Sequence, residues 1–446
     1  MKQALAIAAD VRAGRTSATA VVEACLASLP ADDAPLRAVT RILADRARAE
    51  ASAVDAQIAA GRDPGPLAGL PYGVKDLFDV AGLPTTAGSA LYADAPPAIA
   101  DADAVSRLRA AGAVLVATLN MDEFAYGFAT INARHGTTRN PHDTSRLAGG
   151  SSGGSAAVVA AGLLPFTLGS DTNGSVRVPA SLTGVYGLKP THGDLPMGGV
   201  FPFAASFDDV GHFATSVADM IAIWEVLAGT VAPSDNSAIR VARLGGRFGD
   251  NVDPDQVAAL TAIAPDAPVV VLPDIARARS AAFLITAFEG GALHRAALAR
   301  DAMSFDPQTR DRLIAGALLP QTLCDEAQAF RVAFRRRVLD LIAPYDVLLA
   351  PATPCVAPPV DSPSILIDGE MRPARADLGI HTQPISFLGL PSLAVPLLRS
   401  GRLPIGLQLV GKPGGEAMLF RYASMLEQRG ITGVSAPVGA LQGETA

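Results

Sequence analysis

Two segments rich in glycine and serine hold the side chains best suited to nucleophilic chemistry. GGSSGGS spans residues 149–155 and carries Ser151, and SDTNGSVRVP spans residues 170–179 and carries Ser175. Glycine lets the backbone approach a ligand closely and adopt conformations that other residues avoid. A loop of this composition alone is more often a turn or a linker, but here apolar segments surround it. The two segments are therefore candidates for an active-site loop pair.

Lys75 is the candidate proton acceptor for these serines. It follows an apolar run in GLPYGVKDLFDVAG, residues 69–82. A lysine is ordinarily a solvated surface charge with a pKa of about 10.4. Burial disfavours the ammonium form and can lower this pKa by several units. A neutral lysine amine could then serve as the general base for a serine nucleophile, in place of the usual histidine.

Taken together, these motifs resemble the amidase signature family. The Lys75 segment, GGSSGGS and DTNGSVRVPA occur in the family's order and spacing. Ser151 lies 76 positions after Lys75, and Ser175 lies 24 positions after Ser151. The similarity runs from the N-terminal helices through IGLQLVG at 405–411, which is nearly the whole chain. The resemblance implies an α/β fold in which a large mixed β-sheet lies between helical layers.

The resemblance also implies a role for each matching position. Ser175 corresponds to the nucleophile, Ser151 to the bridging serine in a cis peptide, and Lys75 to the base. The backbone N–H groups that line the oxyanion hole correspond to Thr172, Asn173, Gly174 and Ser175. Many members carry glycine where this chain has Asn173; because the donor is a backbone group, we expect the oxyanion hole to persist. The Asn173 side chain could project toward the substrate and bear on specificity.

Further positions resemble segments that line the family's substrate pocket. The candidates are Tyr126 in MDEFAYGF, Arg139 in RNPHD, Ser152 in the first loop, and Thr382 and Gln383 in HTQPISFLGLPSLAVP. Arg177, two residues after the nucleophile, has two alternative roles. It could bind a substrate carboxylate through two parallel hydrogen bonds, or form a buried ion pair with a carboxylate such as Asp171.

A narrower resemblance concerns the substrate. SDTNGSVRVPASL, FDPQTRDRLIAGALLP at 305–320 and TQPISFLGLP are most similar to the 1-carboxybiuret hydrolases of cyanuric acid and s-triazine breakdown. This resemblance implies release of ammonia, without a cofactor, from a small urea-like substrate that carries a carboxylate. It also implies a homodimer or hetero-oligomer, with a small helical partner like the C subunit of the tRNA-dependent amidotransferases. The alternatives are a general small-amide amidase and a glutaminase-type A subunit of such an amidotransferase.

Two readings outside this chemistry have weaker support. Residues 149–153 satisfy G-x-S-x-G, but RNPHDTSRLA before them does not form the strand that a serine–histidine α/β-hydrolase needs. A binding module that uses the loops as an anion nest lacks the phosphate motifs GxxxxGK[ST] and GxGxxG. No HExxH motif or ligand-spaced cluster predicts a metal site.

Composition limits the class of protein. Hydrophobic residues make up 49% and charged residues 18% of the 446, so a sizeable core is expected and global disorder is excluded. A net charge of −7 argues against a broad nucleic-acid surface. Three widely spaced cysteines predict neither a disulfide framework nor a zinc site, and favour the cytoplasm. The longest weakly polar stretch, 156–168, is too short to span a membrane.

The elements that must position the candidate residues are predicted to form one domain, 1–446. Short apolar runs that alternate with helical patterns predict a mixed sheet with helices on both faces. Ser17 is expected to cap a helix that begins at residue 18, and a long helix is expected over 321–342. The predicted parts are N-terminal helices (1–62), a catalytic core (66–229), a variable cap-like insertion (230–304) and a C-terminal part completing sheet and pocket (305–446).

Overall fold

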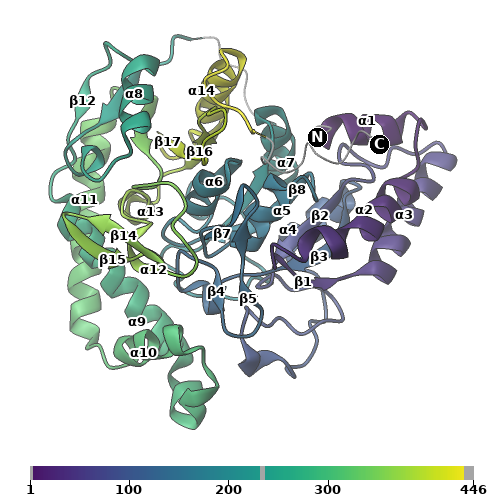
Figure 1. Cartoon of the computed structure of the whole chain (residues 1–446), viewed down its shortest axis with the longest axis horizontal. Coiled ribbons are helices and arrows are strands. Elements are labelled where there is room, and N and C mark those ends of the chain that lie inside the picture. Colours follow the sequence, from purple (N-terminus) through teal and green to yellow (C-terminus); the bar gives the residue numbers. More distant parts are fainter. Residues whose placement is uncertain (1–3, 232–236, 436–446) are drawn as a thin grey trace.

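The computed structural model describes residues 4–231 and 237–435 (Figure 1). Within them, one mixed β-sheet of eleven strands runs through the molecule in the order β1-β3-β2-β8-β10-β9-β16-β17-β13-β11-β12. These strands are β1 (Val39–Ile42), β2 (Pro71–Lys75), β3 (Val114–Leu119), β8 (Phe166–Asp171), β9 (Tyr186–Lys189), β10 (Asp209–Ala214), β11 (Val241–Leu244), β12 (Val269–Val270), β13 (Val347–Pro351), β16 (Ser392–Pro396) and β17 (Gly406–Gly411). The mixed sheet predicted from the sequence is confirmed.

Helices cover both faces of this sheet. They are α1 (Ala4–Arg12), α2 (Ala18–Asp33), α3 (Ala44–Ala59), α4 (Asp103–Ala110), α5 (Gly153–Ala160), α6 (Arg177–Thr183), α7 (Val217–Ala228), α8 (Pro254–Ile263), α9 (Ile275–Asp301), α10 (Pro307–Ala317), α11 (Gln321–Ile342), α12 (Ala374–Asp377), α13 (Gln383–Leu388) and α14 (Glu416–Gln428). Val114 and Val116 of β3 pack in one apolar cluster with α2, α3 and α5, whereas Leu115 packs in another with α4 and α7. Successive strand residues thus reach opposite layers, as a sheet between two helical layers requires.

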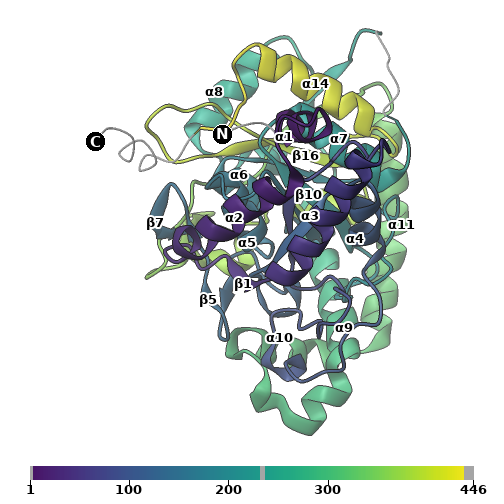
Figure 2. The same cartoon turned by 90° about the vertical axis from the view of Figure 1, so that its right-hand side faces the viewer.

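The N-terminal helices α1, α2 and α3 lie together at one side of the molecule (Figures 1 and 2). Ser17 Oγ accepts a hydrogen bond from the Ala20 N–H, which satisfies a free donor in the first turn of α2. The predicted cap at Ser17 is confirmed, and so is the predicted helix over 321–342, which is α11. Both features could be predicted from residues that lie close together in the sequence.

The 230–304 region contributes to the main sheet as well as to the helical layer. β11 pairs with β13 in parallel, and β12 pairs with β11 at the sheet edge. The long helix α9 packs on α10, α11 and α13. Three short hairpins lie outside the sheet: β4 (Ile131–Asn132) with β5 (Gly136–Thr137), β6 (Arg139–Asn140) with β7 (Asp143–Leu147), and β14 (Ser364–Ile367) with β15 (Glu370–Pro373).

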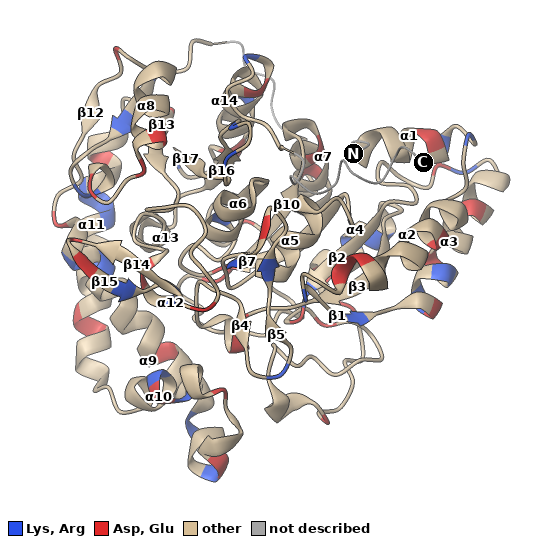
Figure 3. Cartoon of the chain, viewed as in Figure 1, with Lys and Arg blue, Asp and Glu red and all other residues tan. Residues whose placement is uncertain are grey.

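Charged residues of both signs are interspersed over most elements rather than separated by sign (Figure 3). This mixture of signs in the view agrees with the small net charge of −7. Within the described residues, no helix combines the length and the apolar character that a bilayer span requires.

Candidate active site

Lys75 is the last residue of β2, and its side chain is completely buried. Its Nζ lies 2.8 Å from Ser151 Oγ and 2.8 Å from Ser170 Oγ. Burial lowers the pKa of Lys75 from its ordinary value to about 7, although nearby carboxylates oppose this shift. A large fraction of Lys75 is therefore neutral near pH 7 and able to accept a proton from a hydroxyl group.

Parallel strand pairing brings Lys75 to Ser170. β2 pairs with β8 so that Val74 lies opposite Leu168, and the two strands end at the same edge of the sheet. The carboxyl edge of parallel strands is where ligand sites of α/β proteins usually form. Ser170 was not among the sequence candidates, although it directly precedes the DTNGS motif and lies next to Lys75 only through this register.

The loop that carries Ser151 lies against the second glycine-rich segment. The Gly150–Ser151 peptide bond is cis, as the family resemblance implies. A Cβ atom at Gly150 would collide with the Asp122 carboxylate, so only glycine fits there. The Ser152 N–H donates to the Ser175 carbonyl oxygen at 3.2 Å, which ties the two loops together.

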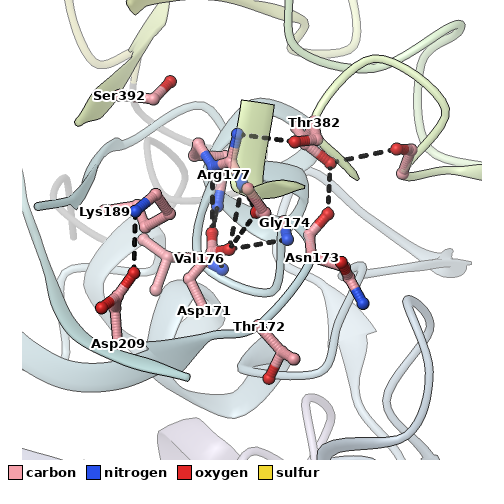
Figure 4. A network of polar contacts seen from close by, with 12 residues as sticks. Asp171, Thr172, Asn173, Gly174, Val176, Arg177, Lys189, Asp209, Thr382 and Ser392 are labelled. Atoms are coloured by element: carbon pink, nitrogen blue, oxygen red, sulfur yellow. Dashed lines mark hydrogen bonds and ion pairs between the residues drawn. The ribbon is translucent and has the colours of Figure 1, made fainter. Parts of the chain in front are cut away.

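A buried ion pair holds the second loop in shape (Figure 4). The Asp171 carboxylate accepts hydrogen bonds from the Gly174 N–H at 2.7 Å and the Val176 N–H at 3.1 Å. Arg177 donates to Asp171 through Nε and Nη2, each at 3.0 Å, and both side chains are fully buried. Burial alone would raise the pKa of Asp171, but the charge and hydrogen bonds of Arg177 bring this pKa below its ordinary value.

The structure therefore supports the second of the two roles considered for Arg177, a buried ion pair with Asp171. Its remaining donors go to the Thr382 carbonyl oxygen, Gln408 Oε1 and Ser386 Oγ. A guanidinium group has five N–H donors, and all five are used, so none is left for a substrate carboxylate. Sequence could not decide this because Gln408 and Ser386 are more than 200 positions away.

Two other expected site groups are also engaged in holding the loop. The Gly174 N–H, an expected oxyanion donor, is bonded to Asp171. Thr382 Oγ1 donates to the Asn173 carbonyl oxygen at 2.9 Å, and Thr382 does not line the pocket described below. Gly174 has a φ of 133°, and a Cβ atom there would collide with Thr382 Oγ1. Loop and threonine therefore fit each other closely.

Ser175 is part of this loop and lines a small pocket. Four other sequence candidates line the same pocket: Tyr126, Thr172, Asn173 and Gln383. Arg139 and Ser152 do not line this pocket. The Arg139 guanidinium donates to the Thr144 carbonyl oxygen in the β6–β7 hairpin, and Ser152 Oγ donates to the Ser170 carbonyl oxygen. No histidine is among the described residues that line the pocket, and no three His, Cys, Asp or Glu side chains in the described part of the chain gather into a metal site.

Two arginines at this pocket were not identified from the sequence. Arg312 of α10 and Arg375 of α12 both donate to the Tyr126 carbonyl oxygen, at 3.1 and 2.9 Å. The Arg312 guanidinium also lies 3.7 Å from the centre of the Tyr126 ring. Burial lowers the pKa of Arg312. Within the described residues no carboxylate forms an ion pair with Arg312, and Asp122 is 3.7 Å from Arg375 Nε.

Arg312 is half-buried and Arg375 is buried, and Asp122 neutralises only part of their combined charge, so a ligand carboxylate would be stabilised there. The pocket therefore combines a serine, a lysine of lowered pKa behind it, and a cationic wall. Arg312 lies in the 305–320 segment that carries part of the narrower resemblance, but no feature of that segment singled out this residue. Its neighbour Tyr126 is 186 positions away.

Comparison with known proteins gives a consistent result. A sequence profile of the family described as Amidase matches residues 20–243 and 272–420. The chain is 46% identical over 445 residues to AtzE of Pseudomonas sp. (strain ADP), a 1-carboxybiuret hydrolase component, covering 94% of this chain and 97% of that protein. It is 36% identical over 467 residues to the A subunit of glutamyl-tRNA(Gln) amidotransferase of Chloroflexus aurantiacus, covering 94% and 95%.

Solved structures share the whole fold. A structure from work on an s-triazine catabolic enzyme and a vestigial protein complex matches with a TM-score of 0.92 and 44% identity, covering 97% of this chain and 100% of that one. The 6-aminohexanoate cyclic dimer hydrolase, complexed with substrate, matches with a TM-score of 0.83 and 27% identity, covering 96% of each chain. The chain belongs to the amidase signature family, whose members hydrolyse the C–N bonds of amides.

Proposed function

We propose that Ser175 is the nucleophile of an amidohydrolase that releases ammonia from a small substrate. The observation that carries this proposal is the buried Lys75, whose Nζ is 2.8 Å from Ser151 Oγ and whose pKa is about 7. A neutral amine behind a relay serine supplies the base that a serine nucleophile needs. The pocket of Ser175 has no histidine among its described lining residues, which weighs against a serine–histidine hydrolase.

The proposed reaction runs in two halves. Ser175 Oγ attacks the carbonyl carbon, and its proton passes through Ser151 to Lys75. The oxyanion is stabilised by backbone N–H groups of the loop, of which Thr172, Asn173 and Ser175 remain candidates because Asp171 holds that of Gly174. The proton then returns to the leaving nitrogen and ammonia departs. Water hydrolyses the acyl-enzyme, with Lys75 again accepting the proton.

We further propose that the substrate carries a carboxylate. Arg312 is half-buried at the pocket and has no carboxylate in an ion pair within the described residues, and the buried Arg375 beside it shares Asp122. Guanidinium groups match carboxylates well in charge and geometry. A relative at 46% identity is named as a 1-carboxybiuret hydrolase, and we propose 1-carboxybiuret as the substrate of this chain. Arg312 takes the role first considered for Arg177.

The proposed assembly follows from the family resemblance, and the proposed compartment follows from the three widely spaced cysteines. We propose that the chain works in the cytoplasm, as a homodimer or as a hetero-oligomer with a small helical protein like the C subunit of the tRNA-dependent amidotransferases. A second candidate function is the glutaminase reaction of an amidotransferase A subunit, which the 36% identity to such proteins favours. Glutamine also carries a carboxylate, so the arginines alone do not separate the two functions.

Ammonia release by the purified protein tests the proposal and separates the candidates. The substrates are 1-carboxybiuret, biuret, malonamate, glutamine and a simple aryl amide, with Ser175→Ala as the control. Preference for 1-carboxybiuret over biuret supports the carboxylate pocket. Preference for glutamine favours the amidotransferase function. Turnover that persists in Ser175→Ala, or a lack of ammonia from every substrate with and without a small helical partner, contradicts the proposal.

A further inference from the structure

Three buried amide atoms at the pocket have no hydrogen-bond partner within the described part of the chain. They are Nε2 and Oε1 of Gln383 and Oδ1 of Asn173. Gln383 is 0% and Asn173 is 6% exposed, and both residues line the pocket with Ser175. Buried amide groups in proteins are almost always paired, because leaving one unpaired costs its desolvation free energy. The unpaired atoms therefore mark hydrogen bonds that a ligand would complete.

The framework fixes where these atoms lie. Asn173 Nδ2 donates to Thr286 Oγ1 of α9 at 2.9 Å, so Oδ1 is the end of this amide that stays free. Figure 4 shows the Asn173 amide directed away from the Asp171–Arg177 ion pair. Gln383 is the first residue of α13, where its N–H donates to the Gly379 carbonyl oxygen at 2.9 Å. The pocket thus presents two free acceptors and one free NH₂ donor.

We infer that Gln383 and Asn173 recognise a ureido group on the substrate. Gln383 Oε1 and Asn173 Oδ1 accept the N–H bonds of –NH–CO–NH₂, and Gln383 Nε2 donates to a carbonyl or carboxylate oxygen further along the molecule. An amide with CH₂ in place of the internal N–H leaves an acceptor unpaired and buried, which disfavours it. This inference rests on the proposed function, because it concerns the same pocket, and it assigns recognition of the internal N–H to two side chains that the structure leaves unpaired.

Two ligands that differ in one group test this inference. N-Carbamoylglycine and succinamate have the same length, the same terminal amide and the same carboxylate, and only the first has an internal N–H. Their binding is measured calorimetrically on the Ser175→Ala protein, so that no turnover is needed. We expect N-carbamoylglycine to bind about tenfold more tightly. In Ser175→Ala/Gln383→Met, where the new side chain has similar size but no amide, we expect this ratio to fall to about twofold or less.

Two further variants make the result specific. Asn173→Gly removes the second acceptor and introduces the residue that many family members carry, and the ratio should fall there as well. Gln321→Met, on an exposed position of α11, is the matched control and should keep the ratio of the Ser175→Ala protein. Together these variants keep the test open if the Gln383 substitution fails to fold.

Equal affinity for the two ligands, or no measurable binding of either, overturns the inference. A ratio that survives both Gln383→Met and Asn173→Gly overturns it as well. Because binding is measured on a protein without the nucleophile, a failure of ammonia release in the active enzyme would count against the proposed function alone. The two proposals can therefore fail separately.

Discussion

Two groups of polar side chains meet at the Ser175 loop and differ in how fully they are paired. In the first, Arg177 uses all its donors within the fold, and the Asp171 carboxylate accepts from it and from the loop backbone. In the second, Arg312 has no carboxylate in an ion pair within the described residues, and the Gln383 amide has no partner there. The first group forms the framework, and we propose that the second binds the substrate. Pairing, rather than distance from Ser175, distinguishes the two roles.

Removing the Ser175 hydroxyl should give the largest effect and should disturb neither group. We expect Ser175→Ala to lower kcat by at least about 10⁴-fold, because a serine nucleophile and its base act as a unit. The free energy of unfolding in urea should be nearly unchanged, because the substitution leaves no polar group of the fold without its partner. Retained turnover would remove Ser175 from the proposed role, and a large loss of stability would show that Ser175 belongs to the framework group.

Arg177→Met should break the framework. It leaves the Asp171 carboxylate buried without its cation, a change that typically lowers the free energy of unfolding by about 3–5 kcal/mol. Urea denaturation measures this loss, and activity should fall with it because the Ser175 loop is no longer held by the Asp171–Arg177 ion pair. An Arg177→Met protein of normal stability with raised KM for carboxylate substrates would reverse the assignment and make Arg177 a substrate-binding residue.

Arg312→Met should affect substrate binding rather than stability. Because Arg312 has no ion-pair partner among the described residues, its removal should change stability little, while KM for a carboxylate substrate rises about 10- to 100-fold. KM for an uncharged amide should be much less affected. Arg336→Met, on an exposed position of α11, is the matched control and should behave like the unaltered protein. Equal changes in KM for charged and uncharged substrates would contradict the carboxylate role of Arg312.

The sequence was sufficient to locate both glycine-rich loops and several residues that line the pocket, but not the arginines of the pocket wall. Lys75, Ser151 and Ser175 lie in short motifs, and the mixed sheet follows from alternating strand and helix patterns. Arg312 and Thr286 reach the pocket from α10 and α9, more than 100 positions from Ser175 along the chain, so only tertiary packing brings them there. The assigned catalytic roles remain predictions until they are measured.

Three residues beside Ser175 show why a motif match can assign the wrong role to a neighbouring residue. Arg177, Gly174 and Thr382 lie within or against the Ser175 loop, and their hydrogen bonds hold that loop in shape. Motif position alone cannot distinguish a side chain that holds a loop from one that faces the substrate. The partners that decide this, such as Gln408, are distant in the sequence.

The pH dependence of kcat/KM tests the central claim, a neutral lysine base, most directly. Burial lowers the pKa of Lys75 to about 7, so Lys75 becomes protonated and unable to accept a proton as the pH falls. With a substrate that does not titrate between pH 5 and 9, we predict a plateau above about pH 8 and a fall of about tenfold per pH unit below pH 7. Glu123 is the necessary control, because burial raises its pKa to about 7 as well. The profile should persist in Glu123→Gln, whereas a rate that stays flat to pH 5, or a fall that disappears in Glu123→Gln, would contradict the account.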